Sequence, residues 1–426
     1  MPDRHPVDDC VHCGFCLPAC PTYLAWGEEM DSPRGRVDLV RALRDGTLQP
    51  TAEVGRHLDR CLGCMACLPA CPSGVRYDRI IEEARAILER TVPRALAQRA
   101  KRRLIFSLFP YPARLRVVAF LLWLLRVTGL ARLLRALGLV RVVPFLRQMD
   151  GLAPELTWRE VTASLAPVTP ASGERRGRVA LVSGCVQRVF FPAVNEATLR
   201  ILAAEGFEVL VPTDQGCCGA LSVHAGREEE ARRLTKALVE RLEATGADFI
   251  LVNAAGCGSH LKDLSLLFRD DPTWRERAAS FSRRVKDVTE FLAAQPARST
   301  RHPLGARVAY HSPCHLGHAQ GVQEPPRALL RAIPGLELVE VPESDHCCGS
   351  AGIYNLVEVE AANEIGARKT GNILATGASY LASANPGCTL HVQRLLREKG
   401  IELPAAHPLE ILDASIRGAP LPRRGH

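Results

Sequence analysis

The chain has 426 residues, 47% of them hydrophobic and 23% charged, with a mean hydropathy near zero. This composition excludes disordered, collagen-like and helical-bundle membrane proteins, and the length exceeds one typical core, so we expect about two to four folded domains. The net charge of +8 is a local feature, because residues 94–147 hold twelve Lys and Arg and no Asp or Glu, which leaves the rest of the chain near −4.

Cysteine is the informative residue type. Sixteen cysteines are too few for a disulfide-stapled small domain and too many for an ordinary cytosolic enzyme, so their number indicates metal binding or redox chemistry. Residues 1–9 are polar and show no secretory pattern, and we therefore expect a protein of the reducing cytoplasm.

Residues 1–92 are predicted to form a ferredoxin-like domain with two [4Fe-4S] clusters. The motif C-x-x-C-x-x-C-x-x-x-C-P occurs twice, from Cys10 and from Cys61. In such motifs the first three thiolates bind one cluster and the fourth binds the other. The predicted ligand sets are therefore Cys10, Cys13, Cys16 and Cys71 for one cluster, and Cys20, Cys61, Cys64 and Cys67 for the second.

Two alternatives accompany this prediction. C-x-x-C pairs also bind zinc, although zinc does not require the three-cysteine run followed by Cys-Pro. His12 lies between Cys10 and Cys13 and is either a further ligand or a surface side chain near the cluster. A helix is predicted over residues 79–89, and Pro93 ends it.

Residues 93–172 are predicted to form short basic amphipathic helices, divided by Pro110, Pro112 and Pro144, and then a linker. The longest apolar stretch, residues 117–125, is about half the ~20 residues that span a bilayer. Phe120 and Trp123 suit a membrane surface, with arginines on anionic headgroups. The alternative is a helical hairpin packed between domains or against a partner subunit. Nucleic acid is not expected as a partner, because aromatic residues between the basic ones are sparse.

Residues 173–300 and 301–426 are predicted to be two copies of one α/β module. Each copy has a strand-like segment before a lone cysteine, a second strand before Cys-Cys-Gly, and a third strand before a last cysteine. Cys314 follows Cys185 by 129 residues, and Cys388 follows Cys257 by 131, so the copies keep register. Helix-like segments over residues 228–244 and 358–375 alternate with the strands, which is typical of parallel α/β units.

The fold class that follows is a multidomain α+β and α/β protein, with a helical two-cluster domain before two duplicated Cys-Cys-Gly modules. Ligands of parallel sheets bind beyond the carboxyl ends of the strands, and every module cysteine falls there. These cysteines would form one or two additional iron-sulfur sites or a thiol redox centre, or they serve the fold without binding a cluster. They are Cys185, Cys217, Cys218, Cys257, Cys314, Cys347, Cys348 and Cys388.

Three histidines lie next to these cysteines in the second module. His311, His315 and His346 are candidates for ligands, for hydrogen-bond donors to ligands, or for ordinary polar loop residues.

The combined motifs resemble those of the iron-sulfur subunit of bacterial glycolate oxidase, also called glycolate dehydrogenase. The segments that carry the resemblance are CVHCGFC with CPTY from Cys10, GEEMDSPRGR from Gly27, HLDRCLGC with CPSGVRY from His57, GCCGA from Gly216, AGCGS from Ala255 and HCCGSAG from His346. The wider superfamily includes heterodisulfide reductase subunits and often ends each module in C-x-x-C. Here Ala254 and Asn385 occupy the earlier position of that pair.

The resemblance implies a complex in which a separate subunit carrying FAD oxidises glycolate to glyoxylate. This chain would pass the electrons towards the quinone pool, from the cytoplasm or from the inner face of the cytoplasmic membrane. No catalytic residue is expected on it, because the sequence contains no G-x-G-x-x-G, P-loop or H-E-x-x-H motif. Two alternatives stay open: another substrate, such as lactate, another 2-hydroxy acid or glycerol 3-phosphate, and disulfide reduction by the Cys-Cys-Gly modules.

Overall fold

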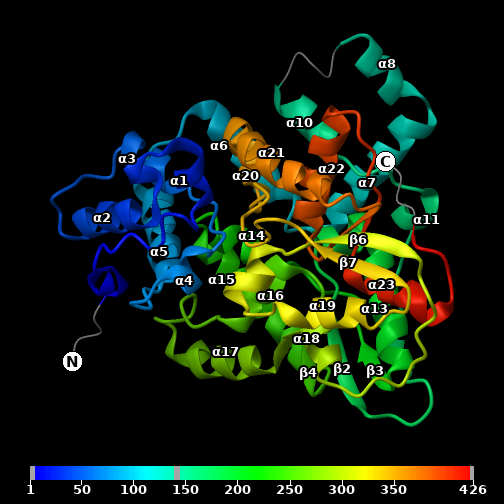
Figure 1. Cartoon of the computed structure of the whole chain (residues 1–426). Coiled ribbons are helices and arrows are strands. Elements are labelled where there is room, and N and C mark those ends of the chain that lie inside the picture. Colours follow the sequence, from blue (N-terminus) through cyan, green and yellow to red (C-terminus); the bar gives the residue numbers. More distant parts are fainter. Residues whose placement is uncertain (1–4, 139–143, 423–426) are drawn as a thin grey trace.

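The computed structural model describes residues 5–138 and 144–422. The N-terminal domain consists of short helices around a small apolar core, and in Figure 1 it lies, in blue, on the side of the molecule away from the strands. The two cysteine motifs form the loops between these helices. The elements are η1 (Pro6–Asp9), α1 (Pro21–Trp26), η2 (Glu29–Asp31), α2 (Pro33–Arg44), α3 (Ala52–Asp59), α4 (Cys67–Ala70) and α5 (Tyr77–Thr91).

Local sequence signals account for several of these helix ends. Ser32 caps α2 by accepting a hydrogen bond from the Gly35 amide, and Pro33 occupies the first turn, where its missing N–H costs nothing. Thr51 caps α3 in the same way. Helix α5 spans the predicted residues 79–89 and ends before Pro93.

The middle segment forms the predicted series of short helices. They are α6 (Leu96–Leu108), α7 (Pro112–Val127), α8 (Leu130–Ala136), α10 (Pro144–Leu152) and α11 (Trp158–Val161). The prolines at 112 and 144 are the first residues of α7 and α10, as their fixed φ favours. No single helix in the described ranges is both long and apolar enough to span a bilayer, and α6 and α7 meet that test only as a pair bent by 101°.

The first Cys-Cys-Gly module contains a five-stranded sheet in the order β1-β3-β2-β4-β5, in which only the β1–β3 pair is antiparallel. Strand β1 comes from the end of the segment that we expected to be a linker, because Val168 and Thr169 pair with the open edge of β3. The elements are β1 (Val168–Thr169), β2 (Gly177–Val182), α12 (Val186–Phe190), α13 (Pro192–Ala204), β3 (Phe207–Leu210), α14 (Ala220–Val223), α15 (Glu228–Glu243), β4 (Phe249–Val252), α16 (Ala255–Lys262), α17 (Pro272–Arg284), β5 (Val285–Asp287) and α18 (Val288–Ala293).

The second module repeats this topology with four parallel strands in the order β7-β6-β8-β9, which corresponds strand for strand to β3-β2-β4-β5. The predicted α/β duplication is thus confirmed. The elements are β6 (Ala306–His311), the π-helix η3 (His315–Ala319), α19 (Glu324–Arg331), β7 (Leu336–Glu340), α20 (Tyr354–Val357), α21 (Val359–Ala375), β8 (Tyr380–Ser383), α22 (Pro386–Glu398), β9 (Ala405–Ala406) and α23 (Pro408–Arg417).

The two modules share one hydrophobic core. Leu181 and Val209 of the first sheet belong to the same buried cluster as Val308 and Tyr380 of the second. Helices α13 and α23 pack against each other across this junction, where Arg200 contacts the buried carboxylate of Asp413 at 2.8 Å. The modules therefore form one body, and the loops at the carboxyl ends of both sheets have fixed relative positions.

Candidate functional site: two cysteine loops and two cysteine clusters

All sixteen cysteines lie in the described part of the chain, and all are free thiols. The first ferredoxin-type group lies at the surface, with Cys13 exposed and Cys10 and Cys16 half-buried. Two exposed apolar side chains, Val11 (68%) and Phe15 (65%), lie in the same loop. A partner protein could therefore reach this loop directly.

The second group repeats the backbone of the first but is buried. His12 and Gly14 have φ values of 57° and 84°, and their counterparts Gly63 and Met65 both have 61°. Left-handed residues at these two places curl the chain around the space between the thiols. Cys61, Cys64 and Cys67 are all buried, so this second loop is shielded from water.

The fourth cysteine of the first group lies beside the second group. Cys20 is buried, and its charge is one of the causes that raise the pKa of Cys64 and of Cys67, after burial as the main cause. The crossed ligand set requires this proximity, although the assignment of individual ligands stays a prediction. A pKa raised this far means that a thiolate there needs a compensating cation, which a cluster iron supplies.

A buried polar network lies behind the second group, and it joins two residues of the DSPRGR segment, Asp31 and Arg36, to residues of α3 and of the turn after it. The Asp31 carboxylate is fully buried and accepts hydrogen bonds from His57 at 3.0 Å and Arg60 at 2.9 Å. Arg36, 1% exposed, donates to the backbone carbonyl of His57 at 2.8 Å. The sequence pattern identified the segment but not this role, because its members meet only in the folded domain.

The positive charge of Arg36 contributes to lowering the pKa of the Cys61 thiol. Burial alone would raise the pKa of the Cys61 thiol, but the guanidinium groups of Arg36 and Arg85, with a hydrogen bond from the Tyr77 hydroxyl at 3.5 Å, turn the net shift downwards. The Gly63 amide also donates to this sulfur at 3.3 Å. The site thus stabilises a negative sulfur at Cys61, as an iron-sulfur ligand requires.

The contacts of His12 do not support a role as a cluster ligand. Its Nε2 lies 3.2 Å from the Asp38 carboxylate and 3.1 Å from Arg41, both on α2. Of the two interpretations, the arrangement favours a surface side chain beside the loop.

In the first Cys-Cys-Gly module four thiols form a continuous chain of contacts. The Cys185 sulfur lies 3.5 Å from that of Cys217, Cys217 contacts Cys218, and Cys218 contacts Cys257. They follow the carboxyl ends of β2, β3 and β4, as predicted. Gly219, with φ of 92°, lets the chain turn so that its amide donates to the Cys217 sulfur at 3.4 Å.

The second module contains the same chain of thiols and adds a histidine. Cys314 contacts Cys347, Cys347 contacts Cys348, and Cys348 contacts Cys388. The ligand atoms of His311, Cys348 and Cys388 lie within 4.8 Å of one another. His311 Nδ1 forms a hydrogen bond of 3.1 Å with the Ser383 hydroxyl. Its Nε2 is therefore the nitrogen that stays available to bind a metal.

His311 and a buried lysine distinguish the second module from the first. In the first module Val182 is the counterpart of His311, and Leu238 is the counterpart of Lys369. Burial lowers the pKa of His311 to about 3, with Lys369 contributing, so the imidazole is neutral and able to bind metal. Lys369 is 2% exposed and provides positive charge near Cys348 and Cys347.

The other two histidine candidates do not point at the sulfurs. The Nε2 of His315 makes a 2.8 Å hydrogen bond with the carbonyl oxygen of Gly63, inside the second ferredoxin-type loop. His346 Nδ1 lies 3.7 Å from the Glu343 carboxylate. His315 therefore links the ferredoxin-like domain to the second module.

The second ferredoxin-type group directly adjoins the second module. Cys64 and Cys347 belong to one buried cluster, against which Cys314 packs, and the charge of Cys314 helps to raise the pKa of Cys64 after burial. The first group, the second group and the second-module thiols thus follow one another from the surface inwards.

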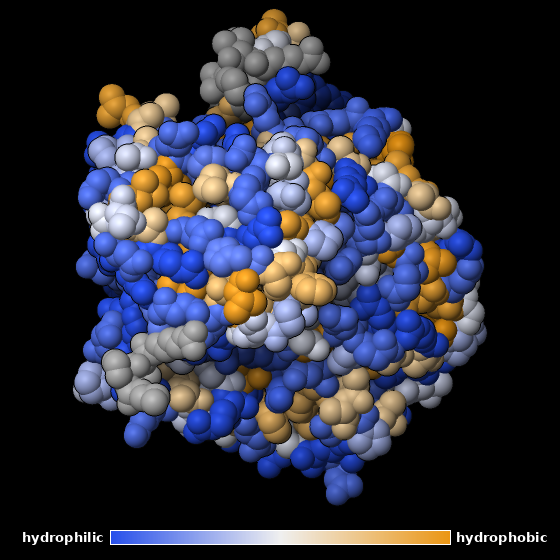
Figure 2. All heavy atoms as spheres, turned by 60° about the vertical axis from the view of Figure 1, so that its left-hand side comes forward, coloured by the Kyte–Doolittle hydropathy of each residue, from blue (hydrophilic) through white to orange (hydrophobic). Residues whose placement is uncertain are grey.

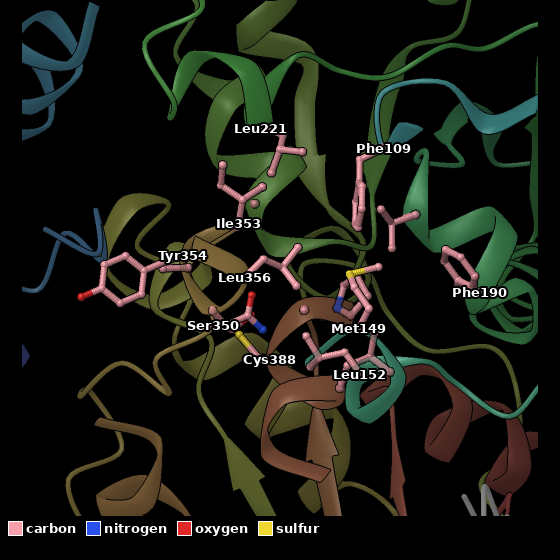
Figure 3. A pocket seen from close by; sticks show the side chains of 18 of the residues that line it. Phe109, Met149, Leu152, Phe190, Leu221, Ser350, Ile353, Tyr354, Leu356 and Cys388 are labelled. Atoms are coloured by element: carbon pink, nitrogen blue, oxygen red, sulfur yellow. The ribbon is translucent and has the colours of Figure 1, made fainter. Parts of the chain in front are cut away.

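A cavity of about 710 Å³ lies between the modules and the middle helices, and seven of the eight module cysteines contribute to its wall. Figure 3 shows how apolar side chains surround the hollow, with Ser350 and Cys388 at one side of it. The labelled apolar residues are Phe109, Met149, Leu152, Phe190, Leu221, Ile353 and Leu356.

His224 adds a titratable group to the same wall. Its Nδ1 lies 3.1 Å from the Glu82 carboxylate, and its ring packs on that of His315 with 5.0 Å between centroids. Burial raises the pKa of Glu82 to about 7 and lowers the pKa of His224 to about 4. This pair connects a carboxyl group of α5 to the cavity.

Comparison with known protein families matches four segments of the chain. The 4Fe-4S dicluster domain matches residues 6–75, the cysteine-rich domain matches residues 179–262 and 308–393, and the linker region of the glycolate oxidase iron-sulfur subunit matches residues 97–153. The cysteine sets described above therefore belong to domains of iron-sulfur proteins.

Individual relatives cover most of the chain. A probable glycolate oxidase iron-sulfur subunit of Bacillus subtilis is 38% identical over 96% of this chain and 94% of its own length. The glycolate oxidase iron-sulfur subunit of Escherichia coli is 34% identical over 90% and 89%. Lactate utilization protein A of Exiguobacterium is 28% identical over 57% of this chain and 99% of its own length.

One solved structure has a similar fold. A hypothetical protein from Helicobacter pylori superposes with a TM-score of 0.54 at 9% identity, over 90% of this chain and 68% of that one.

Proposed function

Because this chain belongs to the family of glycolate oxidase iron-sulfur subunits, we propose that it is the electron-transfer subunit of a glycolate-oxidising complex. A separate flavin subunit would oxidise glycolate to glyoxylate, and this chain would accept the electrons and pass them towards a quinone-type acceptor. Bound [4Fe-4S] clusters supply single-electron redox chemistry, for which the two crossed cysteine sets provide the ligands.

The observation that carries the proposal is the graded burial of the cysteine groups. The first group is open to water at Cys13, the second is enclosed, and Cys64 of the second group packs with Cys347 of the second module. A relay needs one redox centre near a partner and the next ones protected from solvent and close together. The order of these groups meets that need.

The flavin subunit would dock at the exposed loop of the first group. Val11 and Phe15 are large apolar side chains that are about two-thirds exposed, and such residues favour a protein contact. The face of the N-terminal domain in Figure 2 is otherwise predominantly hydrophilic, with hydrophobic side chains in small separate groups. Docking here would place the flavin subunit next to the outermost cluster.

The middle helices would hold the complex at an anionic membrane surface of the cytoplasmic side. Helix α7 has an exposed apolar stripe whose members recur three or four residues apart. An exposed apolar patch of this kind is typical of a contact with a membrane or with another protein. Residues 94–147 contain twelve Lys and Arg and no acidic residue. This net positive charge suits anionic headgroups better than a neutral protein face. The stripe consists of Val117, Phe120, Leu121, Leu124 and Val127.

The test is to purify the chain together with its flavin subunit, without oxygen, and to add glycolate. The proposal requires that glycolate bleaches the iron-sulfur absorbance of this chain and that the chain alone does not respond. Parallel additions of lactate, other 2-hydroxy acids and glycerol 3-phosphate identify the substrate. Flavin reduction without any change in the cluster absorbance would contradict the proposal.

Two other functions have a specific observation behind them. The lactate utilization relative favours a 2-hydroxy acid other than glycolate, and the substrate comparison above decides it. The adjacent free thiols Cys217–Cys218 and Cys347–Cys348 would suit disulfide reduction in the modules. That function requires disulfide turnover by the parent protein and its loss in Cys217→Ser and Cys347→Ser, whereas an inactive parent would eliminate it.

A further inference from the structure

The cavity between the modules has two chemically different walls. One wall is formed by module cysteines, including Cys257 and Cys388, at the carboxyl ends of the two sheets. The opposite wall is formed by apolar side chains of the middle helices, among them Phe109, Leu122 and Met149. Its volume of about 710 Å³ lies within the range of pockets that enclose a small organic ligand.

Among the described residues, four side chains that line the cavity have a buried polar atom without a hydrogen-bond partner, namely those of Arg102, Tyr354, Gln187 and His224. Gln187 is 2% exposed, and neither its amide nitrogen nor its amide oxygen has a partner. His224 uses Nδ1 for Glu82, while its buried Nε2 has none. Buried polar groups are normally satisfied, so these two point to a ligand with carbonyl or hydroxyl groups.

Helix α7 connects the cavity with the outer surface. Leu115, Val118 and Leu122 on its inner side line the hollow, while Leu121 and Leu124 are 49% and 39% exposed on its outer side. The cavity wall continues through Leu125 into α8. A lipid-soluble molecule at the outer stripe would thus meet an apolar wall that leads towards the cysteines.

We propose that this cavity binds the ring and the first part of the tail of a quinone-type acceptor, with the Gln187 amide as a hydrogen-bond donor to one ring carbonyl. This inference rests on the proposed function, because that function supplies the electrons. The apolar wall holds the tail, and His224 faces the ring from the side of α5. The cysteine wall places the bound ring beside the redox-active part of the modules.

Reduction of the bound quinone to the quinol requires a source of electrons and a source of protons. Each quinone takes up two electrons, which come from glycolate through the flavin subunit, and two protons, so that both C=O groups become C–OH and no other bond breaks. His224 would hand one proton to one ring oxygen, and solvent water would supply the second proton to the other ring oxygen. Glu82 keeps 19% of its side chain exposed, and it would restore the proton of His224 from solvent.

The experiment measures binding of a benzoquinone with a ten-carbon tail to the full-length chain with its clusters oxidised, by equilibrium dialysis. Two variants perturb the cavity: Leu122→Trp fills it from α7, and Gln187→Leu removes the amide while keeping the shape. The matched control is Leu121→Trp, which places the same ring on the outer side of the same helix. Iron content of each variant shows that the clusters remain.

The expected result is one quinone bound per chain, at least tenfold weaker binding by Leu122→Trp and Gln187→Leu, and parent-like binding by Leu121→Trp. Absence of saturable binding to the parent, or equal binding by all four proteins, would overturn the inference. Since no electron transfer is measured, a failure here is distinct from a failure of glycolate to reduce the clusters. If glycolate reduces the clusters and no quinone binds, the proposed function stands and the acceptor site lies elsewhere.

Discussion

At the scale of single residues, the DSPRGR segment places charged groups beside the second cysteine group. Asp31 collects Arg36, His57 and Arg60 around one buried carboxylate, and Arg36 in turn faces Cys61. A buried polar network that loses one of its members leaves the others without hydrogen-bond partners, which destabilises the fold. The contribution of each of these residues to stability therefore depends on the others. The segment therefore does more than form a turn before α2, because it provides positive charge next to a cluster ligand.

Tyr77 offers a mild test of this arrangement. The variant Tyr77→Phe removes the hydroxyl that donates to the Cys61 sulfur at 3.5 Å and keeps the buried ring. A hydrogen bond to sulfur stabilises the more negative, reduced cluster, so its loss should lower one reduction potential by about 60 mV, equivalent to about 1.4 kcal/mol for a one-electron couple. A redox titration monitored by EPR measures both clusters, and the cluster of the surface loop serves as the internal control. Equal shifts of both potentials would show that Tyr77 does not act through Cys61.

Gly35 tests the packing of the same segment. A Cβ at this position would lie 2.0 Å from the backbone oxygen of Glu29, which cannot move without displacing η2. We expect Gly35→Ala to destabilise the N-terminal domain by about 2 kcal/mol or more and to accelerate loss of the cluster absorbance on heating. Gly371→Ala is the matched control, since a Cβ there meets nothing within 4 Å. A Gly35→Ala protein that melts like the control would contradict the packing account.

At the scale of elements, the two modules have the same topology but different chemistry. His311 at the end of β6 and Lys369 on α21 have the apolar residues Val182 and Leu238 as counterparts in the first module. We therefore expect His311→Val, which copies the first module, to alter the EPR signal or the iron content of a second-module centre. The reciprocal change Val182→His is the control and should leave that signal as it is. Unchanged iron and spectra in His311→Val would mean that His311 serves only the packing around Ser383.

The outer stripe of α7 makes a separate prediction about location. The double variant Leu121→Glu, Leu124→Glu places two negative charges on that stripe, and it should lower binding to vesicles of anionic lipid roughly tenfold or more in a flotation assay. Val11→Glu, at the exposed loop of the first group, is the control and should float like the parent chain. If the double variant floats normally but no longer binds the flavin subunit, the stripe is a protein interface.

Much of the fold could be predicted from the sequence because its signals are local. The Cys-Pro motifs, the register of the duplicated cysteines and the proline positions at α7 and α10 each depend on a few neighbouring residues. The contacts of Arg36, Tyr77 and His224 could not be predicted, since each reaches a partner at least 16 residues away or in another domain. The shared cavity also depends on how the two modules pack, which no repeat pattern specifies.

At the scale of the whole molecule, the domains arrange the cysteine sets in one inward sequence. The first group lies at the surface, the second adjoins the second module through Cys64, Cys347 and Cys314, and both modules open into one cavity. His315 fixes this junction by its hydrogen bond to Gly63. The two modules and the N-terminal domain thus form a path with an outer and an inner end, as an electron-transfer subunit requires.

The most direct test of that account is the iron and acid-labile sulfide content of the anaerobically purified chain, with EPR of the dithionite-reduced sample. The account predicts about twelve or more irons per chain, which means two ferredoxin-type clusters and at least one further centre on the module thiols, each with a reducible signal. About eight irons would confine the relay to the N-terminal domain. Zinc in place of iron, or no EPR signal after reduction, would contradict the claim that this chain transfers electrons.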